Sequence, residues 1–195
     1  MNTIYMGVYD GLSDWESGYV TAGLAEQRVV TAALTLDPVS TMGGLRILPD
    51  VQLSEVEPSG SAMLVLPGGE PWESGDSLAP FAGKAAAFLE AGVPVAAICG
   101  ATLGLARAGL LDTRRHTSNA PFYLAMAEGY AGAERYVDSP AVTDGDLITA
   151  AAYAPVEFAR EIFAKLEVYP PVVLDAWYRL FGKKDQSAWE VLSSA

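Results

Sequence analysis

The chain has 195 residues, of which 51% are hydrophobic and 18% are charged, and its formal net charge is −12. This length and composition predict one globular domain, residues 1–195, with a well-filled core. Because nucleic-acid phosphates and anionic membranes attract basic surfaces, the acidic excess argues against both as partners. The chain has one cysteine, which excludes an internal disulfide.

Two features bear on localisation. Residues 1–5 contain no basic segment followed by an apolar run, so no signal peptide is expected and we predict a cytoplasmic protein. Residues 93–111 carry a single charged side chain, Arg107, and their hydropathy resembles that of a membrane span. Pro94 and Gly100 interrupt this run, so we assign it to a water-soluble α/β unit.

The N-terminal half of the chain alternates strand and helix patterns. Residues 3–9 predict a first strand, and the capping-box pattern Ser-Asp-Trp-Glu at 13–16 predicts a helix from Ser13 to about Glu26. Further along we expect a strand at 28–34, a small hairpin around 43–44, a buried strand at 63–66 and a helix at 81–91.

The C-terminal half continues the alternation. We expect a strand at 93–98, a helix at 100–108, a short strand at 117–119, a helix at 122–131, strands at 136–138 and 147–150 flanking a turn at 144–145, a helix from Pro155, and a C-terminal helical extension at about 171–195. This order predicts an α/β fold, a mostly parallel sheet with helices on both faces.

The cysteine, Cys99, stands where the apolar run 93–98 meets the helix predicted at 100–108. A side chain on such a strand-to-helix turn is held above the sheet, beside the positive end of the helix. A helix N-terminus lowers the pKa of a thiol, so the pattern favours a nucleophile elbow. The alternative is a buried structural cysteine.

Ligands of parallel sheets bind beyond the carboxyl ends of the strands. Three loops are expected there, at 10–16, 67–73 and 99–100. Donors from the glycines of the second loop, together with the N–H of Gly100, would form an oxyanion hole. Trp72 would either line the pocket or pack at the surface.

Four motifs occur in a specific order: Leu-Pro-Gly-Gly at 66–69, Val-Pro-Val-Ala-Ala-Ile-Cys-Gly-Ala at 93–101, Ala-Gly-Leu-Leu-Asp at 108–112, and Ile-Thr-Ala at 148–150 followed by Pro-Val-Glu-Phe-Ala at 155–159. Across residues 3–167 this order resembles the DJ-1/ThiJ/PfpI superfamily. The resemblance implies a flavodoxin-like three-layer sandwich of the class I glutamine amidotransferase type, commonly a homodimer.

The resemblance also implies roles for individual residues. The reactive elbow cysteine of the family matches Cys99, and the glutamate that hydrogen-bonds it matches Glu16. The glycine pair that supplies N–H groups to the pocket matches Gly68 and Gly69. As the third residue of a capping box, Glu16 would instead turn back to the backbone of Ser13.

The chain departs from the family at its histidines. The protease-like branch carries a histidine directly after the cysteine, where this chain has Gly100. Glutamine amidotransferases need a late His-x-Glu pair, and no histidine follows His116, so both activities are disfavoured. Another branch carries a histidine about twenty residues past the cysteine, where this chain has Asn119. On a strand His116 would have the opposite parity and face away from Cys99, unless a loop or register shift brings it into the pocket.

Three functions remain open. The first is a cysteine-dependent hydrolase, hydratase or glyoxalase-like enzyme on a small carbonyl or amide-type substrate, with Glu16 as proton partner of Cys99. The second is a redox or stress-sensing protein that uses oxidation of Cys99. The third is a non-catalytic binding protein. No cofactor or metal is expected, since the chain has no Cys/His cluster, P-loop or dinucleotide fingerprint.

Overall fold

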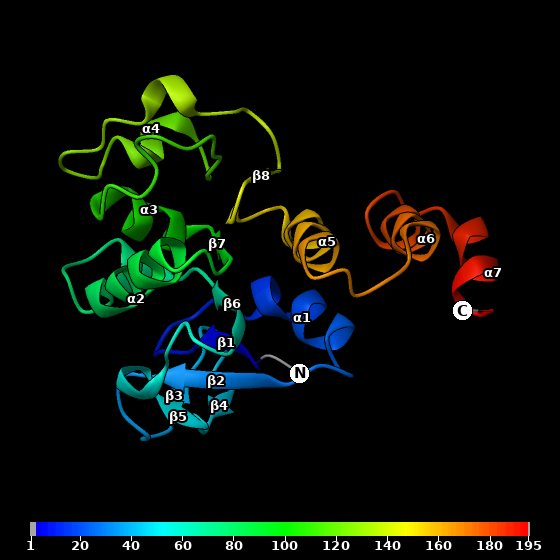
Figure 1. Cartoon of the computed structure of the whole chain (residues 1–195), viewed down its shortest axis with the longest axis horizontal. Coiled ribbons are helices and arrows are strands. Elements are labelled where there is room, and N and C mark those ends of the chain that lie inside the picture. The colour runs from blue at the N-terminus through cyan, green and yellow to red at the C-terminus, as the bar shows by residue number, and fades with distance from the viewer. Residues whose placement is uncertain (1–2, 195) are drawn as a thin grey trace.

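A seven-stranded sheet forms the centre of the computed structural model, which describes residues 3–194. The strand order is β5-β2-β1-β6-β7-β9-β8 (Figure 1). Neighbouring strands are parallel, except that β8 and β9 are antiparallel. The strands are β1 (Thr3–Gly7), β2 (Val29–Ala33), β5 (Val51–Gln52), β6 (Ser61–Leu66), β7 (Val95–Ile98), β8 (Ala141–Asp144) and β9 (Leu147–Ala150). This is the predicted flavodoxin-like α/β architecture.

Helices cover the sheet on two sides. The covering helices are α1 (Asp14–Gly23), α2 (Ala79–Glu90), α3 (Gly100–Arg107) and α5 (Pro155–Lys165). Helix α1 packs with α5, and α2 packs with α3 (Figure 1). Because both faces are covered, β7 and β9 are buried along their whole length, which explains their continuous apolar sequence. In residues 3–194 no helix has the length and hydropathy of a membrane span.

The remaining elements are short or peripheral. The predicted hairpin is confirmed: β3 (Val39–Ser40) pairs antiparallel with β4 (Arg46–Ile47). The other helical pieces are η1 (Leu53–Glu55), η2 (Glu70–Trp72), α4 (Pro121–Leu124), η3 (Ala133–Arg135), α6 (Pro171–Phe181), η4 (Gln186–Ala188) and α7 (Trp189–Leu192).

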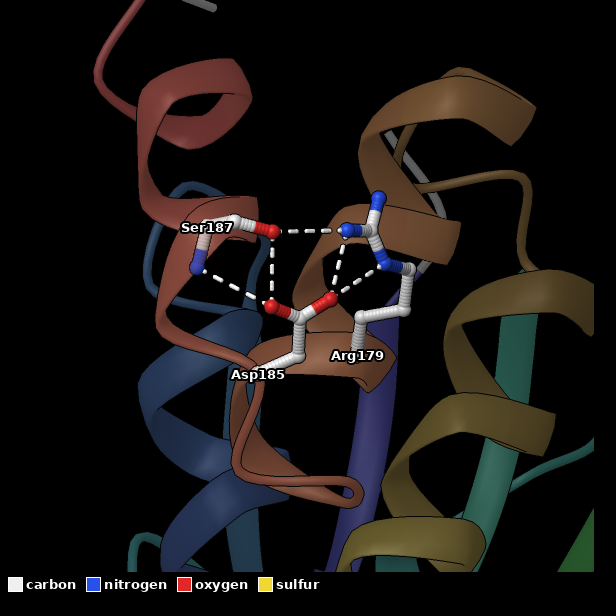
Figure 2. A network of polar contacts seen from close by, with 3 residues as sticks. All are labelled: Arg179, Asp185 and Ser187. Atoms are coloured by element: carbon white, nitrogen blue, oxygen red, sulfur yellow. Dashed lines mark hydrogen bonds and ion pairs between the residues drawn. The ribbon is translucent and has the colours of Figure 1, made fainter.

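An aromatic cluster attaches α6 to the body of the fold. The ring of Trp177 meets Phe163 of α5 at 5.1 Å and Tyr19 of α1 at 5.9 Å between centroids. Beyond α6, Asp185 accepts hydrogen bonds from the guanidinium of Arg179 and from the N–H and hydroxyl of Ser187 (Figure 2). Both partners of this ion pair are solvent-accessible, so it shapes the turn before η4 and adds little stability.

Three predicted elements are wrong in extent. Residues 117–119 form no strand. Instead, the Thr117 N–H donates to the Thr149 hydroxyl oxygen, and the Thr117 hydroxyl donates to the carbonyl of Ser139. The predicted strand at 136–138 is irregular, and the antiparallel partner of β9 is β8, which follows it. The helix expected over 122–131 is the single turn α4, and the chain turns at Gly129, whose φ is +81°.

The contact between α3 and Trp72 gives a stability test. A Cβ at Gly104 would lie 2.2 Å from the Trp72 ring, whereas one at Gly83 of α2 would meet nothing within 4 Å. We expect Gly104→Ala to lower the free energy of unfolding by about 1–3 kcal/mol through overpacking. Gly83→Ala should raise it by about 0.5–1 kcal/mol, because alanine favours the helix interior. Urea denaturation measures both, and equal effects would contradict this packing.

Candidate active site

Cys99 forms the elbow between β7 and α3. Its backbone φ is +57°, an uncommon conformation for a residue with a side chain, which makes the sharp turn. The turn is held on both sides: the Cys99 N–H donates to Ala150 O at 2.9 Å, and the Thr102 hydroxyl donates to Cys99 O at 2.6 Å. The half-buried thiol therefore sits at the carboxyl edge of the sheet.

Glu16 of α1 is completely buried and turned toward this edge. Its Oε2 accepts a hydrogen bond from the N–H of Gly68. The Ser13 N–H donates to Gly68 O at 3.0 Å, so Glu16 does not close the capping box that the sequence pattern suggests. Among the described residues, Glu16 Oε1 has no hydrogen-bond partner although it is buried.

The two ionisable groups perturb each other. Burial raises the pKa of Glu16 to about 7, although the hydrogen bond from the Gly68 N–H lowers it. Burial and then the charge of Glu16 raise the pKa of Cys99 to about 12, against hydrogen bonds from Asn119 and Gly100. The lowered thiol pKa expected from the helix N-terminus is therefore wrong for the resting protein. The groups titrate as a coupled pair.

Glycines line the other side of the thiol. A Cβ at Gly68 would lie 2.5 Å from the Cys99 Cβ and 2.8 Å from the Gly100 nitrogen. A Cβ at Gly100 would lie 2.8 Å from Gly69 O and 3.3 Å from Gly69 N. The backbone nitrogens of Gly69 and Gly100 thus lie close together, and the Gly100 N–H donates to the Cys99 thiol. Two adjacent backbone N–H groups beside a nucleophile are what an oxyanion hole requires.

Asn119 lies beside the sulfur. Its Nδ2 donates to Cys99 Sγ at 3.5 Å, and its Oδ1 accepts the N–H of Ala152 at 2.9 Å. The second bond fixes which end of the amide faces the thiol. The carbonyl of Ala152 accepts the indole N–H of Trp15 at 3.0 Å, which ties this turn to α1.

His116 lies apart from this group. Its ring is buried, with Nδ1 bonded to Arg114 O at 2.7 Å and Nε2 bonded to the Tyr130 hydroxyl at 2.6 Å. Burial lowers the pKa of His116, so the ring is held neutral. With both nitrogens occupied, His116 supports the 116–136 loop, and the structure does not bring it to Cys99.

Trp72 supports the glycine loop from behind. It is buried, its indole N–H donates to the Tyr9 hydroxyl at 2.7 Å, and its ring lies against Gly104. The Tyr9 hydroxyl in turn donates to Pro67 O. Tyr9 is a residue that our sequence reasoning missed, although its place just beyond β1 is a signal for a residue near the site.

Tyr123 of α4 is a second missed residue. It is largely buried and its hydroxyl donates to Glu73 Oε1 at 2.9 Å. No motif marks it, because the short helix that carries it is not periodic. Within residues 3–194, no group of three or more His, Cys, Asp and Glu side chains is placed to hold a metal ion.

The raised pKa of Glu16 predicts a pH-dependent stability. Between pH 4.5 and about 7 the folded protein keeps a proton that the unfolded chain loses, so stability falls as pH rises. At 1.36 kcal/mol per pKa unit, Glu16→Gln should gain about 3 kcal/mol relative to the wild type over this window. Urea denaturation at pH 4.5 and 7.5 measures the difference. Parallel pH profiles of the two proteins would contradict the burial of an ionisable Glu16.

Comparisons with known proteins agree with this geometry. The model of the DJ-1/PfpI family matches residues 2–165. The "Uncharacterized protease YoaZ" of Bacillus subtilis (strain 168) is 41% identical over 188 residues, which cover 91% of this chain and 89% of that protein. The crystal structure of a thiJ/pfpI family protein from Bacillus anthracis superposes with a TM-score of 0.92 at 37% identity, covering 100% of this chain and 97% of that one. That of the DJ-1 superfamily protein Atu0886 from Agrobacterium tumefaciens gives 0.85 at 31% identity, covering 94% and 100%. The chain belongs to the DJ-1/PfpI family.

Proposed function

We propose that this protein is a cysteine-dependent enzyme that acts on a small carbonyl, amide or nitrile-type substrate, in a hydrolase, hydratase or glyoxalase-like reaction. Cys99 is the nucleophile and Glu16 is its acid/base partner. The observation that carries the proposal is the buried carboxyl of Glu16, whose pKa is raised to about 7 beside the elbow thiol. A general base works best when its pKa is near the operating pH.

The first step can be written for a carbonyl substrate. The carboxylate of Glu16 takes the thiol proton as Cys99 Sγ forms a bond to the carbonyl carbon. The π electrons of the C=O bond move to oxygen, where the N–H groups of Gly69 and Gly100 meet the new negative charge. Glu16 then returns the proton to the oxygen or to a leaving group, so that atoms and charge balance.

Asn119 assists without exchanging protons. Its amide is fixed with Nδ2 toward Sγ, so it donates to the sulfur in every protonation state. A hydrogen bond to the charged form favours that form, which lowers the cost of generating the thiolate. Asn119 thus occupies the place of a histidine base but cannot take up a proton.

Protease and glutamine amidotransferase activities are disfavoured. Two relatives bear the name "uncharacterized protease", but this chain has Gly100 where the protease-like branch has histidine. A side chain there would press on Gly69 O, and His116 is bonded elsewhere. A homodimer stays a prediction from the resemblance, and a cytoplasmic location stays a prediction from the N-terminal sequence. Light scattering on the purified protein would test the dimer.

An alternative function is redox sensing. The thiolate of Cys99 would attack hydrogen peroxide, forming an S–O bond and breaking the O–O bond, with release of water once a proton is supplied. The unpartnered Glu16 Oε1 favours this alternative, since a protonated carboxyl there would donate to the new oxygen. The raised thiol pKa weighs against it, because oxidation follows thiolate content.

Alkylation of Cys99 against pH tests the acid/base pair. If Glu16 accepts the thiol proton, the wild-type rate with iodoacetamide should rise to a plateau near pH 7. In Glu16→Gln the inflection should move by more than one pH unit toward the thiol's own pKa, with a rate at pH 7 lower by about tenfold. Cys99→Ala should incorporate no label, which fixes the site. The same inflection in wild type and Glu16→Gln would contradict the assigned role.

Turnover separates the two functions. A panel of small aldehydes, amides and nitriles should include a compound that the wild type converts, and Cys99→Ala should lose at least about 10³-fold in rate. Wild-type rates in Cys99→Ala would exclude cysteine catalysis. If no compound is converted and intact mass after peroxide treatment shows oxygen added in wild type but not in Cys99→Ala, the redox function holds instead.

A further inference from the structure

Tyr9 and Trp72 form a polar pair in the core, behind the glycine loop. Both side chains are buried, and the indole N–H of Trp72 donates to the Tyr9 hydroxyl at 2.7 Å. The Tyr9 hydroxyl donates in turn to Pro67 O, which lies closer to it than Gly68 O at 3.4 Å. Edge-on contacts with the rings of Trp72 and Phe81 hold the Tyr9 ring in place, so its hydroxyl stays directed at the loop.

The peptide between Pro67 and Gly68 carries this interaction to the other side of the loop. The peptide is trans, so its C=O and its N–H point in opposite directions. The C=O accepts the Tyr9 hydroxyl, and the N–H donates to Oε2 of Glu16. A single peptide therefore joins the buried aromatic pair to the carboxyl group of α1.

All donors in this hydrogen-bond chain point the same way. The Trp72 N–H is directed at the Tyr9 oxygen, and the Tyr9 O–H is directed at the 67–68 peptide. The N–H of that peptide is directed at Glu16. Hydrogen bonds in series polarise one another, so a donor on the peptide C=O strengthens donation by the N–H of the same peptide. Since donation to the charged form of a carboxyl group favours that form, the chain stabilises Glu16 as a carboxylate.

Tyr9 keeps its proton while Glu16 titrates. Burial raises the pKa of Tyr9 well above its usual value, and the hydrogen bond from Trp72 lowers it in part. The charges of Glu16 and Cys99 raise it further. Within residues 3–194, the charge of Glu16 acts in this way on two titratable groups, the Cys99 thiol and the Tyr9 hydroxyl. Tyr9 thus remains a donor to the loop in every protonation state of Glu16 and Cys99.

We propose that Tyr9 and Trp72 are positioning residues that act through the 67–68 peptide to stabilise the carboxylate form of Glu16. The inference rests on the proposed function, in which Glu16 must be charged before it can take the thiol proton. Burial opposes that charge, and a donor chain built into the core offsets part of the cost. Two residues that take no part in proton exchange thereby set how readily the base ionises.

The titration of Glu16 itself tests the chain. NMR of isotope-labelled glutamate side-chain carboxyl carbons would follow each glutamate against pH, and the Glu16 resonance is the one that Glu16→Gln removes. Tyr9→Phe deletes the hydroxyl and keeps the ring, while the Trp72 N–H, 3.2 Å from Pro67 O, still leaves that carbonyl a weaker donor. We expect the Glu16 midpoint to rise by at least about 0.3 pH unit in Tyr9→Phe.

Tyr169→Phe is the matched control. The Tyr169 hydroxyl also donates to a backbone carbonyl, that of Gly23 at 2.7 Å, at the opposite end of α1 from Glu16. This variant loses the same kind of hydrogen bond and should leave the Glu16 midpoint unchanged. Trp72→Phe is an independent second variant, because it removes the first donor of the chain. Its Glu16 midpoint should also rise, and the midpoint of the double variant with Tyr9→Phe should rise further.

A double-mutant cycle shows whether the chain acts on the thiol through Glu16. With iodoacetamide, Tyr9→Phe should move the inflection of Cys99 alkylation upward together with the Glu16 midpoint. In the Glu16→Gln background, Tyr9→Phe should leave the inflection where it is, because the carboxylate is gone. A shift of equal size in both backgrounds would mean that Tyr9 reaches the thiol by another route, and it would overturn the inference.

The two readouts separate this inference from the proposed function. An unchanged or lowered Glu16 midpoint in Tyr9→Phe, or the same rise in Tyr169→Phe, would overturn the inference and leave Glu16 as the partner of Cys99. If the midpoint rises as expected but alkylation of Cys99 does not depend on Glu16, the effect of the chain on Glu16 stands and the proposed function fails.

Discussion

The buried contact between Glu16 and Cys99 is the constraint on which the site depends. A carboxyl group that loses all contact with water is costly unless it is hydrogen-bonded or protonated. The Gly68 N–H satisfies one oxygen of Glu16, and the charge of Glu16 raises the pKa of the Cys99 thiol. A side chain at position 68 would push Glu16 and Cys99 apart, because its Cβ would clash with both residues. The loop after β6 therefore requires glycine at this position.

The elbow and the loops around it are fixed by hydrogen bonds that do not belong to regular secondary structure. Thr102 holds the carbonyl of Cys99 and also contacts the Ser118 hydroxyl at 2.6 Å, so α3 and the loop that carries Asn119 are bonded to each other. Asn119 then joins that loop to Ala152. The uncommon backbone conformation of Cys99 persists because contacts from β9, α3 and this loop all enforce it.

The difference between regular elements and these longer-range hydrogen bonds also decides what the sequence could predict. Strands such as β7 and helices such as α5 follow from apolar periodicity, because burial dictates their residues. Residues 117–119 look like a strand locally, but Thr149 and Ser139, distant in sequence, supply their partners. The pattern at 13–16 places the start of α1 correctly, yet the side chain of Glu16 bonds to Gly68, which local sequence does not reveal.

The proposed mechanism needs no histidine to activate the thiol, because it moves an existing charge and does not create a new one. In a Cys–His pair, proton transfer between neutral groups creates two opposite charges, which a buried environment penalises unless they are well solvated. In the proposed first step the carboxylate of Glu16 would take the proton from a neutral thiol, so that one negative charge would shift from oxygen to sulfur and no charge would be created. Gly68 donates to the charge before the shift, and Asn119 donates after it. In this mechanism the carboxyl base and the fixed amide would together do what an imidazole does in a Cys–His pair.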